Sequence, residues 1–204
     1  MKTEEKAIEL VPLGPRFSSA LAYAAELHGD QARKGTAIPY VAHLLAVAAI
    51  VIEYGGDEDQ AIAALLHDAV EDQGGHDTLK RIRARFGERV AGLVDACTDS
   101  YEQGPQKPEW KSRKEQYLAS LAGKPREALL ISAADKLHNA TSILEDYLVH
   151  GEDLWPRFKG GRESLWYYRE LVKHLRGCTD SRLHRRLEAT VKELHHLAQE
   201  EYLE

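Results

Sequence analysis

Apolar residues recur along this chain at intervals of three and four residues, and no stretch shows the alternation typical of a half-buried strand. This periodicity predicts a fold built from α-helices alone. The expected helices cover residues 18–28, 40–54, 57–73, 79–86, 88–97, 111–121, 125–149, 161–175 and 181–203. Glycine and proline separate them, most clearly at Gly55-Gly56 and Gly74-Gly75, and we expect residues 100–110 to form an exposed loop.

The length of 204 residues fits one helical domain with an extension. Hydrophobic residues make up 43% of the chain, which is enough for a hydrophobic core. We therefore expect an N-terminal segment at 1–17, a domain over 18–150, and C-terminal helices over 151–204 that pack on the same domain. The oligomeric state is not predicted by any feature of the sequence.

Charge and hydropathy exclude several classes of partner. The formal net charge is −6, which argues against nucleic acid or a membrane surface as the main partner. No apolar run approaches the ~20 residues that span a bilayer, and residues 1–9 lack the apolar core of a secretory signal. The two cysteines, Cys97 and Cys178, lie far apart and fit a reducing compartment. The expected location is cytoplasmic.

Four titratable residues end the otherwise apolar helix expected over residues 57–73. His67, Asp68, Glu71 and Asp72 follow Ala63-Ala64-Leu65-Leu66. On one continuous helix, the i, i+3 and i, i+4 spacings among them place all four on neighbouring parts of one surface. Acidic residues on a buried helix are costly unless they are paired or coordinated. A divalent cation would satisfy this group.

Two further titratable residues interrupt apolar segments. His43 lies within Tyr40–Val47, and Asp135 follows Leu129–Ala134. Taken singly, each would be interpreted as a core residue that finds a hydrogen bond. Three such interruptions in one small helical protein favour a shared site instead. Two imidazoles and two carboxylates form a mixed nitrogen and oxygen ligand set that suits Mn²⁺, Fe²⁺ or Zn²⁺.

The order of these residues resembles the HD superfamily of metal phosphohydrolases. The segments Pro39–His43, Ala63–Asp72, Phe86-Gly87 and Ala134–Asn139 resemble, more specifically, the hydrolase domain of the RelA/SpoT family. The resemblance covers residues 18–145, and the chain has no room for a synthetase domain. It is therefore similar to the small alarmone hydrolases, the group of the stand-alone metazoan SpoT homologue.

The resemblance implies a role for each matching residue. It makes His43, His67, Asp68 and Asp135 the ligands of one divalent metal, characteristically Mn²⁺. Glu71 and Asp72 match the acidic pair that activates the attacking water, and which of the two accepts the proton stays open. Asn139 matches a position at the nucleotide site, and Arg33 and Lys34 match basic residues near the substrate.

The implied reaction removes the 3′-pyrophosphate of a purine alarmone, (p)ppGpp or (p)ppApp, and leaves the 5′-phosphorylated nucleoside. The preferred base and the number of 5′-phosphates stay open. An alternative is a broader phosphatase of 5′-nucleotides or NADPH, which would release orthophosphate. A non-catalytic alarmone sensor is the weakest reading, because every ligand position and the acidic pair are filled.

Three other groups of residues have two interpretations or none that involves metal. Trp110–Lys114 either brings positive charge over the phosphates or begins a solvated helix. The aromatic group within Trp155–Tyr168 is expected to pack in the core, with stacking on a purine base as the alternative. We do not predict that His28, His138 or the pair His195-His196 binds metal.

Overall fold

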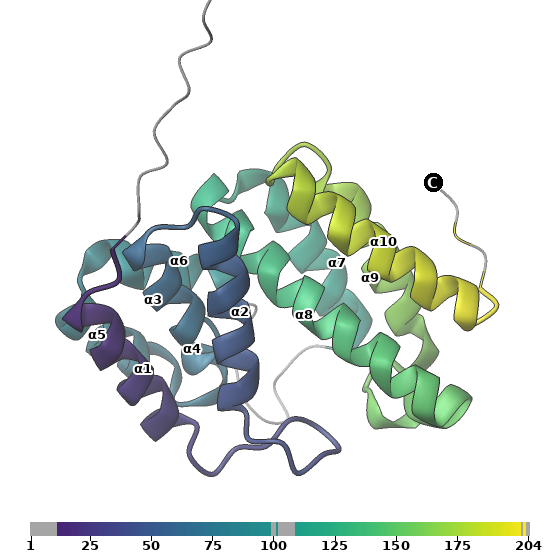
Figure 1. The fold of residues 1–204 in the computed structure, drawn as a ribbon, viewed down its shortest axis with the longest axis horizontal. Coiled ribbons are helices and arrows are strands. Elements are labelled where there is room, and N and C mark those ends of the chain that lie inside the picture. Colours follow the sequence, from purple (N-terminus) through teal and green to yellow (C-terminus); the bar gives the residue numbers. More distant parts are fainter. Residues whose placement is uncertain (1–11, 99–100, 102–108, 201, 203–204) are drawn as a thin grey trace, which may run out of the picture.

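The computed structural model describes residues 12–98, 101, 109–200 and 202 (Figure 1). These residues form helices and no strands, which confirms the all-α prediction; a single isolated β-bridge joins Ala32 and Pro39. The α-helices are α1 (Pro15–Leu27), α2 (Val41–Glu53), α3 (Glu58–Leu66), α4 (Ala69–Asp72), α5 (Gly75–Phe86), α6 (Glu88–Cys97), α7 (Trp110–Ser120), α8 (Arg126–His150), α9 (Ser164–Leu175) and α10 (Ser181–Leu197). The 3₁₀ helices are η2 (Leu121–Gly123), η3 (Gly151–Arg157) and η4 (Gly161–Glu163).

Helix α3 lies at the centre of the first half of the fold. Its start is fixed by a capping box, in which the Asp57 carboxylate accepts from the Gln60 amide at 3.0 Å and the Gln60 side chain accepts from the Asp57 amide at 3.1 Å. Residues 60–66 are all buried, and α3 packs against α1, α2, α6 and α8. This packing holds the C-terminal end of α3 in place.

The expected single helix over 57–73 is wrong, because the chain breaks at His67 and Asp68 and resumes as the one-turn helix α4. The His67 imidazole Nδ1 lies 2.8 Å from the Ala64 carbonyl oxygen, the acceptor that the Asp68 amide would use in a continuous helix. Asp68 has φ −94° and ψ −6°, which turns α4 away from the axis of α3.

Other boundaries differ in smaller ways. Helix α1 begins at Pro15 rather than near Ser18, because Gly14 provides an extended N-cap and proline suits the first helical position. The expected start of a helix at 161 is instead η4, which precedes α9. The helix expected to reach residue 203 ends at Leu197, and residues 198–200 are not helical, with Gln199 at φ 52°. Most of the segments 1–17 and 100–110 lie outside the described residues.

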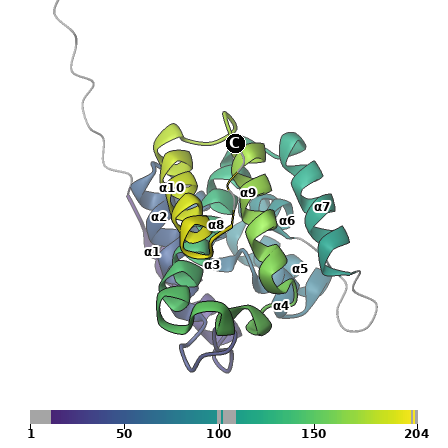
Figure 2. The ribbon, with the colours of Figure 1, turned by 90° about the vertical axis from the view of Figure 1, so that its right-hand side faces the viewer.

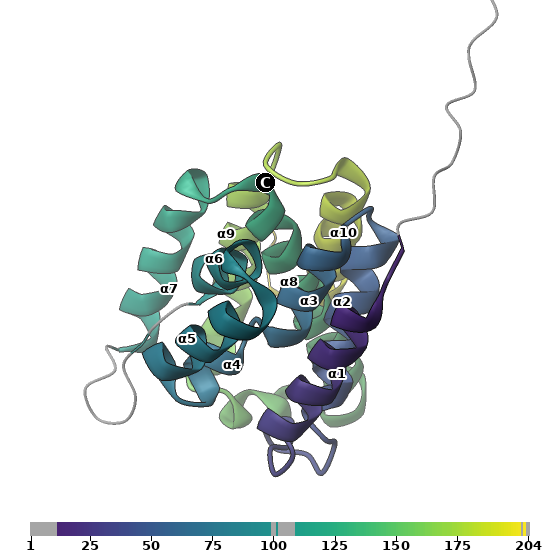
Figure 3. The same cartoon turned by 90° about the vertical axis from the view of Figure 1, so that its left-hand side faces the viewer.

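The long helix α8 connects the two halves of the structure. It packs against α2, α3 and α6 on one side and against α9 and α10 on the other (Figure 1). Figure 2 shows α9 beside α10, with α7 next to α9, and Figure 3 shows α1 beside α2 on the opposite face. Among the residues that the structure describes, no helix is both long and apolar enough to cross a membrane.

Candidate metal centre and cleft

Helix α2, the turn after α3 and helix α8 bring two imidazoles and two carboxylates together. His43 Nε2 lies 3.2 Å from an Asp135 oxygen and 3.5 Å from an Asp68 oxygen. His67 Nε2 lies 3.1 Å from the same Asp68 oxygen and 3.6 Å from the same Asp135 oxygen. The two imidazoles therefore share both carboxylates, although the four residues come from segments that are far apart in the sequence.

The orientation of the two imidazoles suits a bound cation. His67 Nδ1 is 2.8 Å from the Ala64 carbonyl oxygen, so Nδ1 carries the proton and donates it there. His43 Nδ1 lies 2.8 Å from His138 Nδ1. Both Nε2 atoms are buried, and neither has a hydrogen-bond partner among the described residues. Buried nitrogens without partners are costly, and a metal ion would satisfy both.

Burial strengthens the electrostatics of this cluster. His43, His67 and Asp135 are buried, and one potential ligand atom of each lies within 4.8 Å of the others. Although burial opposes the shifts, the His67 imidazole holds the pKa of Asp68 well below its usual range, and Lys136 and both imidazoles do the same for Asp135. Burial lowers the pKa of His67, but the Asp68 and Asp135 carboxylates raise it well above its usual value. Both carboxylates therefore stay ionised and can coordinate a cation.

A second set of side chains orients the carboxylates. The Tyr40 hydroxyl donates to Asp68 at 2.5 Å. Asn139 donates to one Asp135 oxygen at 2.5 Å, and Lys136 donates to the other at 2.6 Å. The Asn139 carbonyl oxygen in turn accepts from Arg33 at 2.8 Å. Two of the residues predicted to contact substrate, Arg33 and Asn139, are therefore linked to the metal centre through Asp135.

The structure places His138 as a hydrogen-bond partner of His43 rather than as part of the buried cluster. Burial and the positive charge of nearby groups, His43 first among them, lower the pKa of His138 to about 4. His138 is therefore neutral, and its Nδ1 accepts the His43 Nδ1 proton. His138 follows Asp135 by three residues on one helix, and this spacing is the sequence signal that places His138 beside the cluster.

Glu71 and Asp72 have different surroundings on α4. Glu71 borders two adjacent cavities, a cleft of about 590 Å³ and an inner cavity of about 70 Å³. Asp72 borders neither, and its carboxylate accepts from Gln31 at 2.8 Å. Burial and the charge of Asp68 raise the pKa of Asp72. Of the two, only Glu71 lies at the wall of the space that a substrate can enter.

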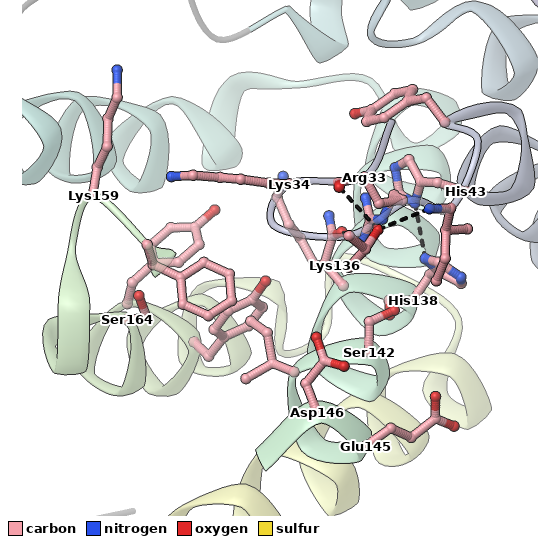
Figure 4. Close-up of a pocket in the computed structure, with 18 of the residues that line it drawn as sticks. Arg33, Lys34, His43, Lys136, His138, Ser142, Glu145, Asp146, Lys159 and Ser164 are labelled. Carbon is pink, nitrogen blue, oxygen red and sulfur yellow. Dashed lines mark hydrogen bonds between the residues drawn. The ribbon is translucent and has the colours of Figure 1, made fainter. Parts of the chain in front are cut away.

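The cleft and the inner cavity meet beside the buried cluster. Glu71, Lys114 and Lys136 line both spaces, His43 lines the cleft, and His67, Asp68 and Asp135 line the inner cavity. Figure 4 shows Lys34 extending from the region of Arg33 toward Lys159, with Glu145 and Asp146 farther along α8. Burial and the charge of Lys159 lower the pKa of Lys34. The Lys159 charge thus reaches Lys34 and disfavours its protonated form, an effect that a bound anion would offset.

The segment after residue 150 contributes directly to the cleft. Phe158, Lys159, Tyr167 and Tyr168 line it. Trp155, Tyr167 and Tyr168 are packed in the core as predicted, and the two tyrosines also border the cleft. Trp110, Arg113 and Lys114 also line it, which favours the interpretation that this segment brings positive charge to the cleft. Lys136 and Lys159 were missed as cleft residues. The position of Lys136 directly after Asp135 could have indicated that it lies near the site. No pattern around Lys159 distinguishes it from a solvated lysine.

An all-helical fold with a buried His–His–Asp cluster beneath a cationic cleft defines a protein equipped to hold a divalent metal beside an anionic ligand. The family model described as HD domain matches residues 20–163, and the chain belongs to this HD domain family. It is similar to the SpoT-type hydrolases within that family.

Several relatives are similar over most of this chain. The guanosine-3′,5′-bis(diphosphate) 3′-pyrophosphohydrolase MESH1 of Xenopus tropicalis is 36% identical over 158 residues, which is 76% of this chain and 82% of the relative. MESH1 of Drosophila melanogaster is 33% identical over 165 residues, covering 79% of this chain and 86% of the relative. The solved structure of a metazoan SpoT orthologue, described as hydrolysing ppGpp, matches with a TM-score of 0.72 at 30% identity and covers 92% of this chain and 98% of that chain.

Bacterial relatives are much longer than this chain. The guanosine-3′,5′-bis(diphosphate) 3′-pyrophosphohydrolase of Aquifex aeolicus is 39% identical over 124 residues, which is 61% of this chain and only 17% of the relative. A relative from Synechocystis, named as a probable guanosine-3′,5′-bis(diphosphate) 3′-pyrophosphohydrolase, is matched over 16% of its length. The chain thus corresponds to less than a fifth of these relatives.

Proposed function

We propose that this protein hydrolyses the 3′-pyrophosphate of a purine alarmone, releasing pyrophosphate and leaving the 5′-phosphorylated nucleoside. The observation that carries this proposal is the position of the buried His–His–Asp cluster, which adjoins a cleft of about 590 Å³ lined by several lysine and arginine side chains. Such a cleft suits a nucleotide with several phosphates. The names of the similar relatives favour (p)ppGpp as the first substrate to test, and (p)ppApp has the same scissile group.

His43, His67, Asp68 and Asp135 would hold one divalent ion, which we propose is Mn²⁺. The partnerless Nε2 atoms and the shared carboxylate oxygens support this ligand set. When bound, the ion would supply Lewis-acid activation of water and of the phosphate. The hydrogen bonds that reach Asp68 and Asp135 from their neighbours would keep both carboxylates oriented.

Glu71 is the proposed general base. It lies at the junction of the cleft and the inner cavity, where a water attacking a phosphorus near the cluster would be found. Asp72 instead accepts from Gln31 and is proposed to support α4 and the negative potential of the site. A carboxylate that borders the reaction space can accept the proton of the attacking water, whereas one turned to a neighbouring amide cannot do so without rearranging.

The cationic residues around the cleft are proposed to bind the phosphates. Arg33 is fixed by Asn139, so its guanidinium is presented at the cleft wall close to the metal centre. Lys34 faces Lys159 across the cleft and would neutralise phosphate charge at greater distance from the cluster. Oriented cations of this kind stabilise the charge that develops during phosphoryl transfer.

The test is to incubate the purified chain with Mn²⁺ and either ppGpp or ppApp and to measure pyrophosphate and nucleoside diphosphate. A His67→Ala, Asp68→Ala double variant controls for contaminating phosphatases. His174→Ala, Asp77→Ala is the matched control, because both side chains are exposed. Pyrophosphate that is lost only in the first variant supports the proposal. Orthophosphate from NADPH or a 5′-nucleotide, without pyrophosphate from either alarmone, would replace it with the broader phosphatase, and no turnover would leave a sensor.

A further inference from the structure

Tyr167 carries a polar atom that the fold leaves unsatisfied. The residue lies on α9 and is 4% exposed. Its hydroxyl is buried and has no hydrogen-bond partner among the described residues, yet Tyr167 lines the cleft. A buried hydroxyl without a partner destabilises a protein. An acceptor atom supplied by a bound ligand would remove that penalty.

Lys136 lines the same cleft as Tyr167, its charge acts on the Tyr167 hydroxyl, and it lies close to the metal centre. Its ammonium is 2.6 Å from one oxygen of Asp135, whose other oxygen is 3.2 Å from His43 Nε2. The Lys136 ammonium therefore contacts the Asp135 oxygen that the two imidazoles do not share. Burial raises the pKa of Tyr167 well above its usual value, and the nearby Lys136 charge opposes this only in part. The hydroxyl thus keeps its proton and can donate it.

The surroundings of the pair also suit an anion. Lys136 and Lys114 both border the cleft and the inner cavity, and the Lys114 ammonium lies 5.1 Å from the centre of the Tyr167 ring. The Lys136 ammonium lies 5.2 Å from the centre of the Tyr117 ring. Two ammonium groups at the junction of the two cavities thus share the cleft with a phenol hydroxyl, and all three are hydrogen-bond donors.

We propose that the Tyr167 hydroxyl and the Lys136 ammonium together bind the outer phosphate of the substrate's pyrophosphate group and of the pyrophosphate product. This inference rests on the proposed function and adds two binding residues to it. The scissile phosphorus must lie close to the metal cluster, and the next phosphate along the pyrophosphate is one bridging oxygen farther away. Lys136, which contacts the Asp135 oxygen turned away from the two imidazoles, lies just beyond the cluster and borders the cleft. The Tyr167 donor then completes the coordination of this outer phosphate.

Calorimetric titration of pyrophosphate into the Mn²⁺-loaded full chain tests this assignment, with the same Mn²⁺ concentration in cell and syringe. Tyr167→Phe keeps the ring and removes only the hydroxyl. We expect it to weaken pyrophosphate binding about tenfold, the usual effect of losing one charge-assisted hydrogen bond. Binding of the nucleoside 5′-diphosphate product should change less than twofold. The melting temperature should stay the same or rise, because an unsatisfied hydroxyl has been removed.

Tyr23→Phe is the matched control. The Tyr23 hydroxyl is also buried without a partner among the described residues, but Tyr23 packs beside Phe86 and borders neither cavity. Its pyrophosphate affinity should equal that of the wild type. The assignment is overturned if Tyr167→Phe binds pyrophosphate within twofold of wild type, if both variants lose affinity equally, or if the wild type does not bind pyrophosphate. Alarmone turnover by the wild type, measured separately, shows whether the proposed function itself holds.

Discussion

Removal of the metal should destabilise this protein by an amount that depends on pH in a defined direction. In the metal-free protein the pKa of His67 lies well above its usual value, so a proton occupies this imidazole at neutral pH. A metal ion that binds at Nε2 must displace that proton. His138 is already neutral, with a pKa of about 4, and releases none. Binding of one ion should therefore release about one proton from His67 throughout the range below its folded pKa.

The size of this loss of stability follows from the thermodynamic linkage between metal binding and folding. A metal at 100 times its dissociation constant stabilises the fold by about 2.7 kcal/mol. For a chain of this size, 1 kcal/mol shifts the melting temperature by about 2–4 °C, so chelation should lower it by roughly 5–11 °C. Release of one proton weakens metal affinity about tenfold for each pH unit of acidification, which is about 1.4 kcal/mol. The chelator-dependent shift should thus shrink by roughly 3–6 °C per pH unit.

The pH dependence of the metal-free protein's own stability acts in the same direction. The positive charge of protonated His67 is attracted by the Asp68 and Asp135 carboxylates, so its contribution to stability is present below the unfolded pKa and is lost as pH rises through the folded pKa. The lowered pKa values of the two carboxylates contribute stability that is lost only in acid. Raising the pH therefore weakens the metal-free form while it favours metal binding, and the gap between the two forms widens.

Thermal melts with Mn²⁺ or with chelator, repeated between about pH 6 and pH 8, measure this gap. His67→Ala should abolish the chelator-dependent shift, whereas His174→Ala, which changes an exposed imidazole, should preserve it. Proton release can be measured independently by calorimetry in buffers of different ionisation enthalpy. A shift that is the same at every pH, or the absence of any shift with metal, would refute the assignment of His67 as a ligand that exchanges a proton for the ion.

Three further predictions concern the base, the orientation of Asp135 and the core. Glu71→Gln should lower kcat at least ~100-fold with metal affinity unchanged, whereas Asp72→Asn should lower it only about tenfold, as measured by pyrophosphate release and metal titration. Equal losses in the two variants would contradict the assignment of Glu71 as the base. Asn139→Ala should weaken metal binding about tenfold, because Asp135 loses a donor, and isothermal titration measures this directly. Leu66→Ala should lower the free energy of unfolding by about 2–5 kcal/mol in urea, since the side chain is fully buried.

Much of the fold could be predicted because helical periodicity in this chain is regular. The segments expected over 40–54, 88–97 and 125–149 correspond closely to α2, α6 and α8. The break at His67 could not be predicted from periodicity, because the apolar pattern continues through Ala69 and Val70, which are both buried. It arises from a side-chain hydrogen bond to the Ala64 carbonyl, a contact that competes with the helix only when the imidazole adopts one particular orientation.

The candidate site was predictable where a titratable residue interrupts an apolar segment. His43, His67 and Asp135 carry that signal because burial of a charged or polar group needs a compensating partner. Lys159 carries no such signal, because its side chain is exposed and its position beside the cleft depends on how the segment after α8 folds back. Sequence therefore predicts the buried part of a site better than its solvated rim.

The break between α3 and α4 also explains how three neighbouring carboxylates come to have different surroundings. On a continuous helix, Asp68, Glu71 and Asp72 would face the same region and repel one another. In the structure Asp68 turns toward the two imidazoles, Asp72 turns toward Gln31, and Glu71 is left at the cavity wall. The three carboxylates thus lie in different surroundings, and the pKa of Asp68 is lowered whereas that of Asp72 is raised. The same imidazole that is proposed to bind the metal makes the hydrogen bond at the break, so the local fold that separates the carboxylates and the proposed ligand set both depend on His67.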